Sequence, residues 1–154
     1  MNLKATLSPD DLARACADAM WKDDDASSGL GMKIIDIGPG RATLSMSVQP
    51  HMVNGQRIAH GGFIFTLADS AFAFACNSHN EKAVAAQGNI TFIRPGRLGD
   101  TLIAVAREIS RSGRSGIYDV RVTVGDDVIA EFRGHSRTIG GAWLPGGESD
   151  AKKK

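Results

Sequence analysis

The composition lacks an excess of charge of either sign. Eighteen lysine and arginine residues stand against 17 aspartate and glutamate residues, which gives a formal net charge of +1. A nearly neutral chain has no basic surface of the kind that holds nucleic acid or an acidic membrane. We therefore expect neither nucleic acid nor a membrane among its partners.

Cysteines and long apolar runs are also scarce. The two cysteines, Cys16 and Cys76, lie far apart and form no Cys-x-x-Cys pair, a usage typical of a reducing compartment. Residues 1–11 lack the apolar core of a signal peptide. The most apolar stretch, 60–76, is shorter than the roughly 20 residues that span a bilayer. These absences predict a soluble cytoplasmic protein.

The spacing of metal ligands is missing as well. His51, His79 and His135 stand apart, and no cluster of His, Cys, Asp or Glu has the spacing of a metal site. We expect no metal and no cofactor, and we assign these histidines to the surface or to packing.

The most informative stretch that is present is the apolar segment 60–76, which carries one charge, Asp69. A helix that is apolar on all sides is normally buried in a core. Gly61 and Gly62 at its start allow close approach and leave backbone N–H groups unpaired, because the first turn of a helix has no internal acceptors. A lone carboxylate in such a helix is costly unless it is paired, hydrogen-bonded or functional. We interpret this segment as the floor of an active site.

The remaining chain reads as one domain, as its 154 residues suggest. Ser8-Pro9-Asp10-Asp11 has the order of a helix start, and an amphipathic helix should follow. Period-two patterns predict strands over 32–37, 41–48, 83–94, 100–110, 117–124 and 128–139. We divide the chain into an N-terminal helix and linker (1–29), a main domain (30–139) and a disordered tail (140–154).

This layout predicts an α+β architecture, an antiparallel sheet covered on one face by one apolar helix. Six strands of a single chain do not easily enclose a helix that is apolar on all sides. We therefore expect the protein to form a dimer or a larger homo-oligomer.

Several short motifs together resemble one known family. They are Asn54-Gly55, His60-Gly61-Gly62, the helical run 67–72 with its acid, and the later landmarks 88–92, Pro95, 99–100, 113–114 and 118–120. Their order and spacing resemble the hotdog-fold acyl-CoA thioesterases of the phenylacetic acid degradation type, from about residue 31 to residue 139. The resemblance implies a long helix wrapped by a curved antiparallel sheet, with chains paired into dimers and often tetramers.

The resemblance also implies roles for individual residues. The Gly61 N–H would bind the thioester carbonyl, Asn54 would bind substrate or position water, and Asp69 would be general base or nucleophile. Some relatives place a Ser or Thr near the acid. The corresponding residues 84–87 contain no hydroxyl group, and Gln87 is a candidate helper there. In the family, helix start and acid come from different subunits.

Other residues near these motifs are candidates for contact with substrate. His60 is expected to hold the loop before the helix, and Gly62 lies beside it. Arg111 and Arg114 flank a turn, where they are either surface charges or contacts for the phosphates of coenzyme A, which favour arginine.

The chemistry agrees with this reading, because a helix N-terminus stabilises an oxyanion and a carboxylate in an apolar setting has raised basicity. We expect hydrolysis of an aromatic (phenylacetyl- or hydroxyphenylacetyl-like) or medium-chain acyl-CoA. The alternatives are a non-catalytic acyl-CoA-binding domain and a hotdog hydratase or dehydratase. For Asp69 itself, the alternative is a structural acid held by a partner such as Arg94 or Ser70.

Overall fold

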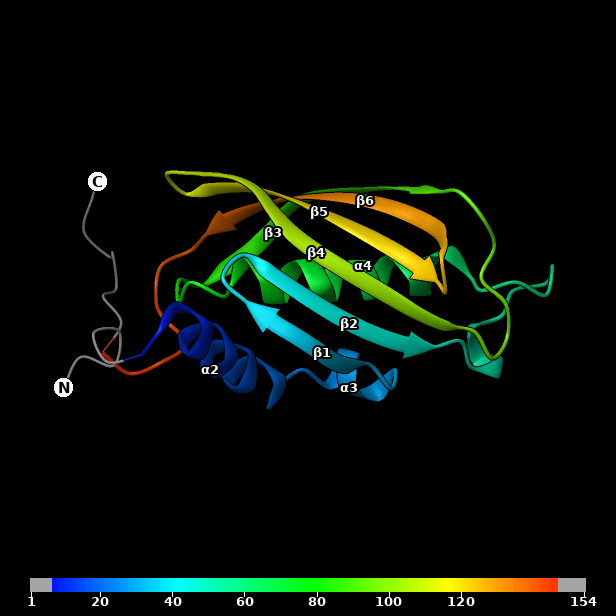
Figure 1. Cartoon of the computed structure of the whole chain (residues 1–154), viewed down its shortest axis with the longest axis horizontal. Coiled ribbons are helices and arrows are strands. Elements are labelled where there is room, and N and C mark those ends of the chain that lie inside the picture. The colour runs from blue at the N-terminus through cyan, green and yellow to red at the C-terminus, as the bar shows by residue number, and fades with distance from the viewer. Residues whose placement is uncertain (1–6, 147–154) are drawn as a thin grey trace.

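A computed structural model describes residues 7–146 (Figure 1). One antiparallel sheet has the strand order β1-β2-β4-β5-β6-β3. Its strands are β1 (Lys33–Gly38), β2 (Arg41–Ser47), β3 (Ala83–Phe92), β4 (Thr101–Ser112), β5 (Ser115–Val124) and β6 (Asp127–Thr138). The helices are α2 (Pro9–Trp21), α3 (Asp25–Gly29), the 3-10 turn η1 (Pro50–Met52) and the long α4 (Gly61–Cys76). The predicted α+β architecture and all six predicted strands are confirmed, with ends that differ by a few residues.

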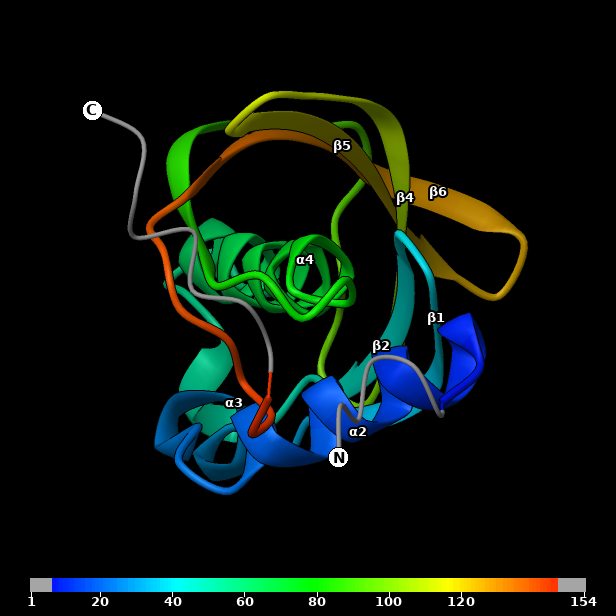
Figure 2. The same cartoon turned by 90° about the vertical axis from the view of Figure 1, so that its left-hand side faces the viewer.

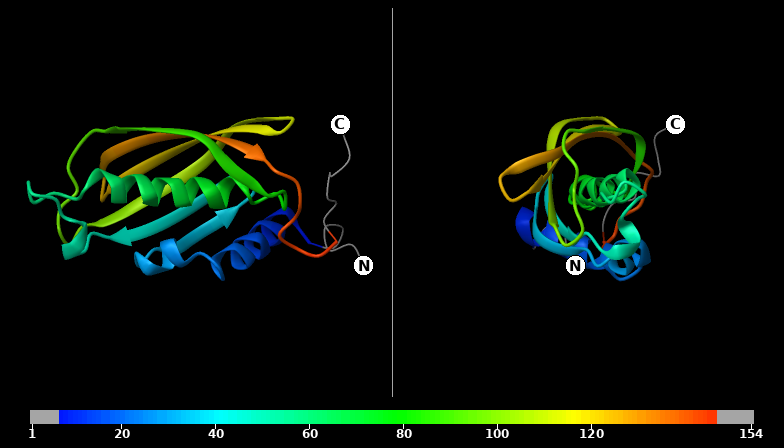
Figure 3. Two further views of the ribbon diagram at one scale, coloured as in Figure 1. Left: turned by 180° about the vertical axis from the view of Figure 1, so that it is seen from behind. Right: turned by 90° about the vertical axis from the view of Figure 1, so that its right-hand side faces the viewer.

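The sheet curves around α4, as the view along the helix shows (Figure 2). The buried side chains of α4 are Ile64, Leu67, Ala68, Ala71, Phe72, Phe74, Ala75 and Cys76. Residues of α4 that are not buried include Gly62, Thr66, Asp69 and Ala73, which are small or polar. In the left panel of Figure 3, α4 lies in front of the sheet. The described chain buries eight of the 16 residues of α4. The expectation that the protein forms a dimer or a larger homo-oligomer stays a prediction.

The first strand after α4, β3, does not pair with the next strand in the chain, although β4, β5 and β6 pair in chain order. β3 pairs with β6 at one edge of the sheet, and β4 instead pairs with β2 in the middle. β3 is thus an edge strand, and nearly all of its residues are exposed. Large apolar side chains on β3 and on the connection to β4 are about half exposed, namely Val84 (47%), Phe92 (51%), Ile93 (49%) and Leu98 (52%). Other exposed large apolar side chains lie on β1, on β4 and after β6, namely Ile35, Val105, Ile109 and Ile139. The β3 group differs in lying on and beside a free strand edge, a place that invites pairing with another chain.

The N-terminal segment packs beside β1 and under α4. Ser8 caps α2 by accepting a hydrogen bond from the Asp11 N–H (3.1 Å), as predicted. The sequence patterns missed α3, which Asp24 caps through the Ser27 N–H (2.9 Å). Ser27 also shares a hydrogen bond with Ser70 of α4 (2.8 Å between hydroxyl oxygens), so α3 is fastened to the central helix.

The structure describes the first part of the predicted tail, residues 140–146, and places it against the end of α4. The Trp143 indole N–H donates to Asn77 Oδ1 (2.9 Å), and Asn80 Oδ1 accepts the N–H groups of Trp143 and Leu144 (both 3.0 Å). These residues therefore differ from the disorder expected of them, because two buried asparagines of the turn after α4 supply acceptors. Residues 147–154 of that prediction lie outside the described residues.

Candidate active site

The loop before α4 is organised by Asn54. Its side-chain oxygen accepts hydrogen bonds from the N–H groups of Gln56 (2.9 Å) and Ile58 (3.4 Å), and its backbone N–H donates to the Ile58 carbonyl (2.9 Å). Because both bonds to the side chain come from N–H donors, the acceptor must be Oδ1. The Nδ2 group therefore remains available, with no acceptor among residues 7–146.

The first turn of α4 leaves one particular N–H group unused. His60 caps the helix, because its Nδ1 accepts the Gly62 N–H (2.9 Å) and its carbonyl accepts the Phe63 N–H (3.0 Å). The Gly61 N–H has no acceptor in the described part of the chain. His60 therefore holds the loop as expected, with its ring proton on Nε2. Its cap occupies the Gly62 N–H, so of the two glycines only Gly61 retains an unpaired donor among residues 7–146.

A cleft of about 600 Å³ opens in front of this donor. Asn54 and Gly61 both line it, together with Gln56, Ile58, Ala59, Ile64, Phe92, Ile93, Arg94 and Pro95. A Cβ atom on Gly61 would lie 2.8 Å from Phe92 Cζ, so only glycine lets this ring pack so close to the helix start. The cleft thus brings together two of the three predicted catalytic residues, with apolar walls around two free N–H donors.

One wall of this cleft was not predicted. The segment from Phe92 to Pro95 reaches it because the Ala59 N–H donates to the Gly96 carbonyl (2.7 Å), which joins the connection after β3 to the loop before α4. In the sequence, Pro95-Gly96 indicates only the end of a strand. The contact depends on two loops that lie far apart along the chain.

Asp69 is one of the α4 residues that are only partly buried. The partners weighed for a structural role are engaged elsewhere, since Arg94 pairs with Asp127 (2.8 Å) and Ser70 with Ser27. No hydrogen bond or ion pair holds the Asp69 carboxylate within residues 7–146. Burial raises its pKa above the usual range of an aspartate, as desolvation of a charged form predicts.

Asp69 and Gly61 of one chain do not meet. Eight residues separate them along α4, which corresponds to about 12 Å at 1.5 Å per residue. Asp69 does not line the cleft in front of Gly61. A single chain therefore presents the unpaired Gly61 N–H and the Asp69 carboxylate at places that lie apart.

Gln87, the candidate helper of the acid, faces away from α4. Its cross-strand neighbour is His135, an exposed residue, whereas the adjacent pairs Gly88–Gly134 and Ile90–Phe132 face the helix. The register shift between Ala85 and Gln87 sets this alternation. The structure therefore places Gln87 on the outer face of the sheet, away from Asp69 of its own chain.

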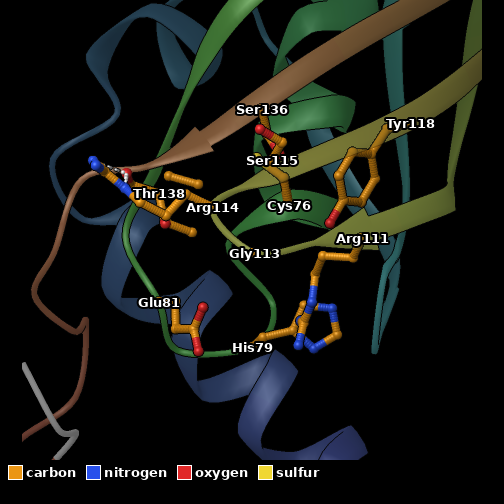
Figure 4. A pocket seen from close by; sticks show the side chains of 11 residues that line it. Cys76, His79, Glu81, Arg111, Gly113, Arg114, Ser115, Tyr118, Ser136 and Thr138 are labelled. Carbon is orange, nitrogen blue, oxygen red and sulfur yellow. Dashed lines mark hydrogen bonds between the residues drawn. The ribbon is translucent and has the colours of Figure 1, made fainter. Parts of the chain in front are cut away.

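Arg111 and Arg114 lie at the opposite end of α4 from Gly61. Arg114 donates to the Thr138 carbonyl (3.3 Å from Nε and 2.9 Å from an Nη atom), as Figure 4 shows. Both arginines line a pocket of about 10 Å³, close to the limit for one water molecule. This pocket has no room for a phosphate group.

The same end of the molecule contains a hydrogen-bonded group that the sequence did not indicate. Glu108 accepts hydrogen bonds from the buried Tyr118 hydroxyl (2.7 Å) and from His79 Nε2 (3.0 Å). Burial works to raise the pKa of Glu108, yet these two partners lower it below its usual range. Burial and Glu108 together raise the pKa of Tyr118. These contacts fix His79, which was expected to serve packing or the surface.

The described residues contain no group of three or more His, Cys, Asp or Glu side chains that could hold a metal ion. None of the helices within residues 7–146 is long and apolar enough to cross a membrane.

Comparison with known proteins agrees with this geometry. The thioesterase superfamily matches residues 56–131. The chain is 44% identical over 126 residues to the acyl-coenzyme A thioesterase PaaI of Escherichia coli K12, an alignment that covers 81% of this chain and 90% of the relative.

Solved structures give the same result. The E. coli PaaI protein from the phenylacetic acid degradation operon superposes with a TM-score of 0.86 at 41% identity, over 88% of this chain and 99% of that one. The smu.793 protein of Streptococcus mutans UA159, solved bound to acetyl-CoA, superposes with a TM-score of 0.70 at 27% identity, over 72% and 90% of the two chains. With this likeness in sequence, strand order and central helix, the chain belongs to the thioesterase superfamily and has its hotdog fold.

Proposed function

We propose that this protein is a soluble cytoplasmic thioesterase that hydrolyses an aromatic (phenylacetyl- or hydroxyphenylacetyl-like) or medium-chain acyl-CoA to the free acid and coenzyme A. The observation that carries the proposal is the unpaired Gly61 N–H at the start of α4, which lines the cleft beside Asn54. The thioesterase activity named for the E. coli relative and the acetyl-CoA bound by the S. mutans protein support the same substrate class.

The Gly61 N–H and the Asn54 Nδ2 group act on the carbonyl oxygen of the thioester. As a nucleophile adds to the carbonyl carbon, negative charge develops on this oxygen. Fixed donors at a helix N-terminus stabilise that charge without reorganisation, and removing one such donor costs roughly a hundredfold to a thousandfold in rate.

Asp69 of the partner subunit supplies the other half of the reaction. As general base it takes a proton from water, whose oxygen adds to the carbonyl carbon; as nucleophile its own oxygen adds and water later hydrolyses the anhydride. In both routes the carbon–sulfur bond breaks, the thiolate of coenzyme A leaves, and it takes up a proton to give the thiol. The raised pKa of Asp69 makes it a stronger base than an exposed aspartate. No metal or cofactor takes part in these steps.

A dimer brings the two halves together. The free edge of β3, with its half-exposed Val84 and Phe92, is the surface we assign to pairing with a second copy. Antiparallel pairing of two α4 helices beside that edge would bring Gly61 of one chain close to Asp69 of the other. Two dimers can further associate into a tetramer.

The test is a panel of aromatic and straight-chain acyl-CoA substrates with detection of the released thiol. Asp69→Asn keeps the shape of the side chain and removes the base, so we expect a rate loss of at least about a hundredfold. Asp18→Asn, on the exposed face of α2, is the matched control and should retain full activity. Tight binding of acyl-CoA without thiol release by the wild type would show a binding domain and contradict the proposal.

A further inference from the structure

We propose that a second groove beside Asn54, lined by Arg57 and Arg97, binds the phosphate groups of coenzyme A. This inference rests on the proposed function and deepens it, because it assigns the part of the substrate that lies far from the reacting carbonyl. The groove measures about 400 Å³ and is lined by Pro50, Val53, Asn54, Arg57, Arg97 and Leu98. Asn54 lines both this groove and the cleft in front of Gly61, so the two are adjacent.

The backbone holds Arg57 in an uncommon conformation at this place. Its φ of 65° lies in the left-handed region, which non-glycine residues adopt only where the surroundings fix it. The Arg57 N–H donates to the Asn54 carbonyl (3.0 Å), and Asn54 Oδ1 holds the residues on either side of Arg57, Gln56 and Ile58. Asn54 thus fixes the base of the Arg57 side chain while it also lines the reaction cleft.

Arg97 is fixed from the other loop. Its N–H donates to Asp100 Oδ2 (2.8 Å), and the Asp100 N–H donates to its carbonyl (3.0 Å). The hydrogen bond from Ala59 to Gly96 (2.7 Å), directly before Arg97, joins this loop to the one that carries Arg57. Two loops, bonded to each other, therefore present one guanidinium each to the same groove.

The groove beside Asn54 is lined by two arginines that have no counter-charge within residues 7–146. Some exposed arginines of the sheet are paired with carboxylates, as in Arg41–Asp36, Arg121–Glu131 and Arg133–Asp119. Neither Arg57 nor Arg97 has an ion-pair partner within the described residues, and the lining of the groove includes no acid. Two uncompensated guanidinium groups on one groove favour an anionic ligand.

Coenzyme A has the matching chemistry. Its pantetheine arm separates the thioester from a diphosphate and a ribose phosphate, so an anion site must lie outside the apolar reaction cleft. Guanidinium groups bind phosphate oxygens through paired N–H donors. The other candidates, Arg111 and Arg114, face a pocket of about 10 Å³. The groove beside Asn54 has both the room and the charge that this pocket lacks.

The experiment compares two substrates that share one acyl group, an acyl-CoA and the corresponding acyl-pantetheine thioester, which has no phosphate. The measured quantity is the ratio of kcat/KM for acyl-CoA to kcat/KM for acyl-pantetheine. In the double variant Arg57→Gln with Arg97→Gln we expect this ratio to fall at least about tenfold, since charged hydrogen bonds are lost. Arg137→Gln, an exposed arginine of β6, is the control and should leave the ratio unchanged.

An unchanged ratio in the double variant overturns the inference. This includes an equal loss of kcat/KM on both substrates, because that result means damage to the loops and not loss of phosphate contacts. If the wild type hydrolyses neither thioester, the proposed function fails and the groove is tested on its own by calorimetric titration with coenzyme A. The groove is supported if coenzyme A binds the wild type and Arg137→Gln, and binds the double variant at least about tenfold more weakly. Equal binding by all three proteins, or no binding, rejects the groove.

Discussion

If Gly61 and Asp69 act on one substrate from different subunits, two inactive variants should restore each other. Asn54→Asp keeps the oxygen that accepts from Gln56 and Ile58 and removes the free amide donors. Asp69→Asn removes the base. We expect each variant alone to retain roughly a hundredth of wild-type activity or less. Neither change removes a hydrogen bond seen within residues 7–146, so both proteins should fold.

The size of the rescue follows from the symmetry of a dimer with two equivalent sites. After the two variants are unfolded, mixed in equal amounts and refolded, roughly half of the dimers contain one chain of each kind. Such a dimer has one site with intact Asn54 facing intact Asp69 and one doubly defective site. The mixture should therefore reach about a quarter of wild-type activity, roughly 25-fold above either parent.

The assay is thiol release from acyl-CoA by the refolded mixture, with refolded wild type as reference. The matched control mixes wild type with a double variant that carries both substitutions. In that mixture every mixed dimer is inactive, so activity should be about a quarter of wild type, and not the half expected if each chain holds a complete site. Activity of the first mixture no higher than the mean of its parents would refute the shared site.

Other predictions follow from the same structure. The raised pKa of Asp69 means that kcat/KM should fall on acidification at a higher pH than an ordinary aspartate would give, a profile that Asp69→Asn should lose. Because the folded state favours the protonated carboxyl, this group stabilises the fold at low pH, and the benefit is lost as pH rises through the folded pKa. The uncharged side chain of Asp69→Asn avoids this loss, so its Tm should exceed the wild-type Tm most at neutral pH, and the difference should shrink on acidification. Val84→Lys places a charge on the half-exposed edge of β3, so sedimentation velocity should show a smaller species than the wild type, and an unchanged oligomer would exclude this edge as the interface. Activity should survive exhaustive chelation, whereas a loss restored by zinc or manganese would contradict the mechanism. His60→Ala removes the acceptor of the Gly62 N–H and should lower stability by about 1 kcal/mol, which thermal unfolding would record as a drop of roughly 2–4 °C in Tm.

The sequence by itself determined the main elements, though not α3, and the spacing of residues along them. The apolar segment with one acid specified the central helix, and period-two patterns specified six strands, because local periodicity decides which face a residue can bury. The separation of Gly61 and Asp69 along one helix is also a local property, so a site shared by two subunits could be proposed before any tertiary contact was known.

Only the tertiary structure decided which groups meet. β3 lies at the edge beside β6 because pairing depends on how the chain crosses the sheet, and the register shift near Ala85 turns Gln87 outward. The cap made by His60 selects the Gly61 N–H over that of Gly62. Arg57 and Arg97 share a groove because hydrogen bonds join two loops that are distant in sequence. Such contacts between remote segments leave no periodic pattern in the chain, and they form only when the whole sheet has closed around the helix.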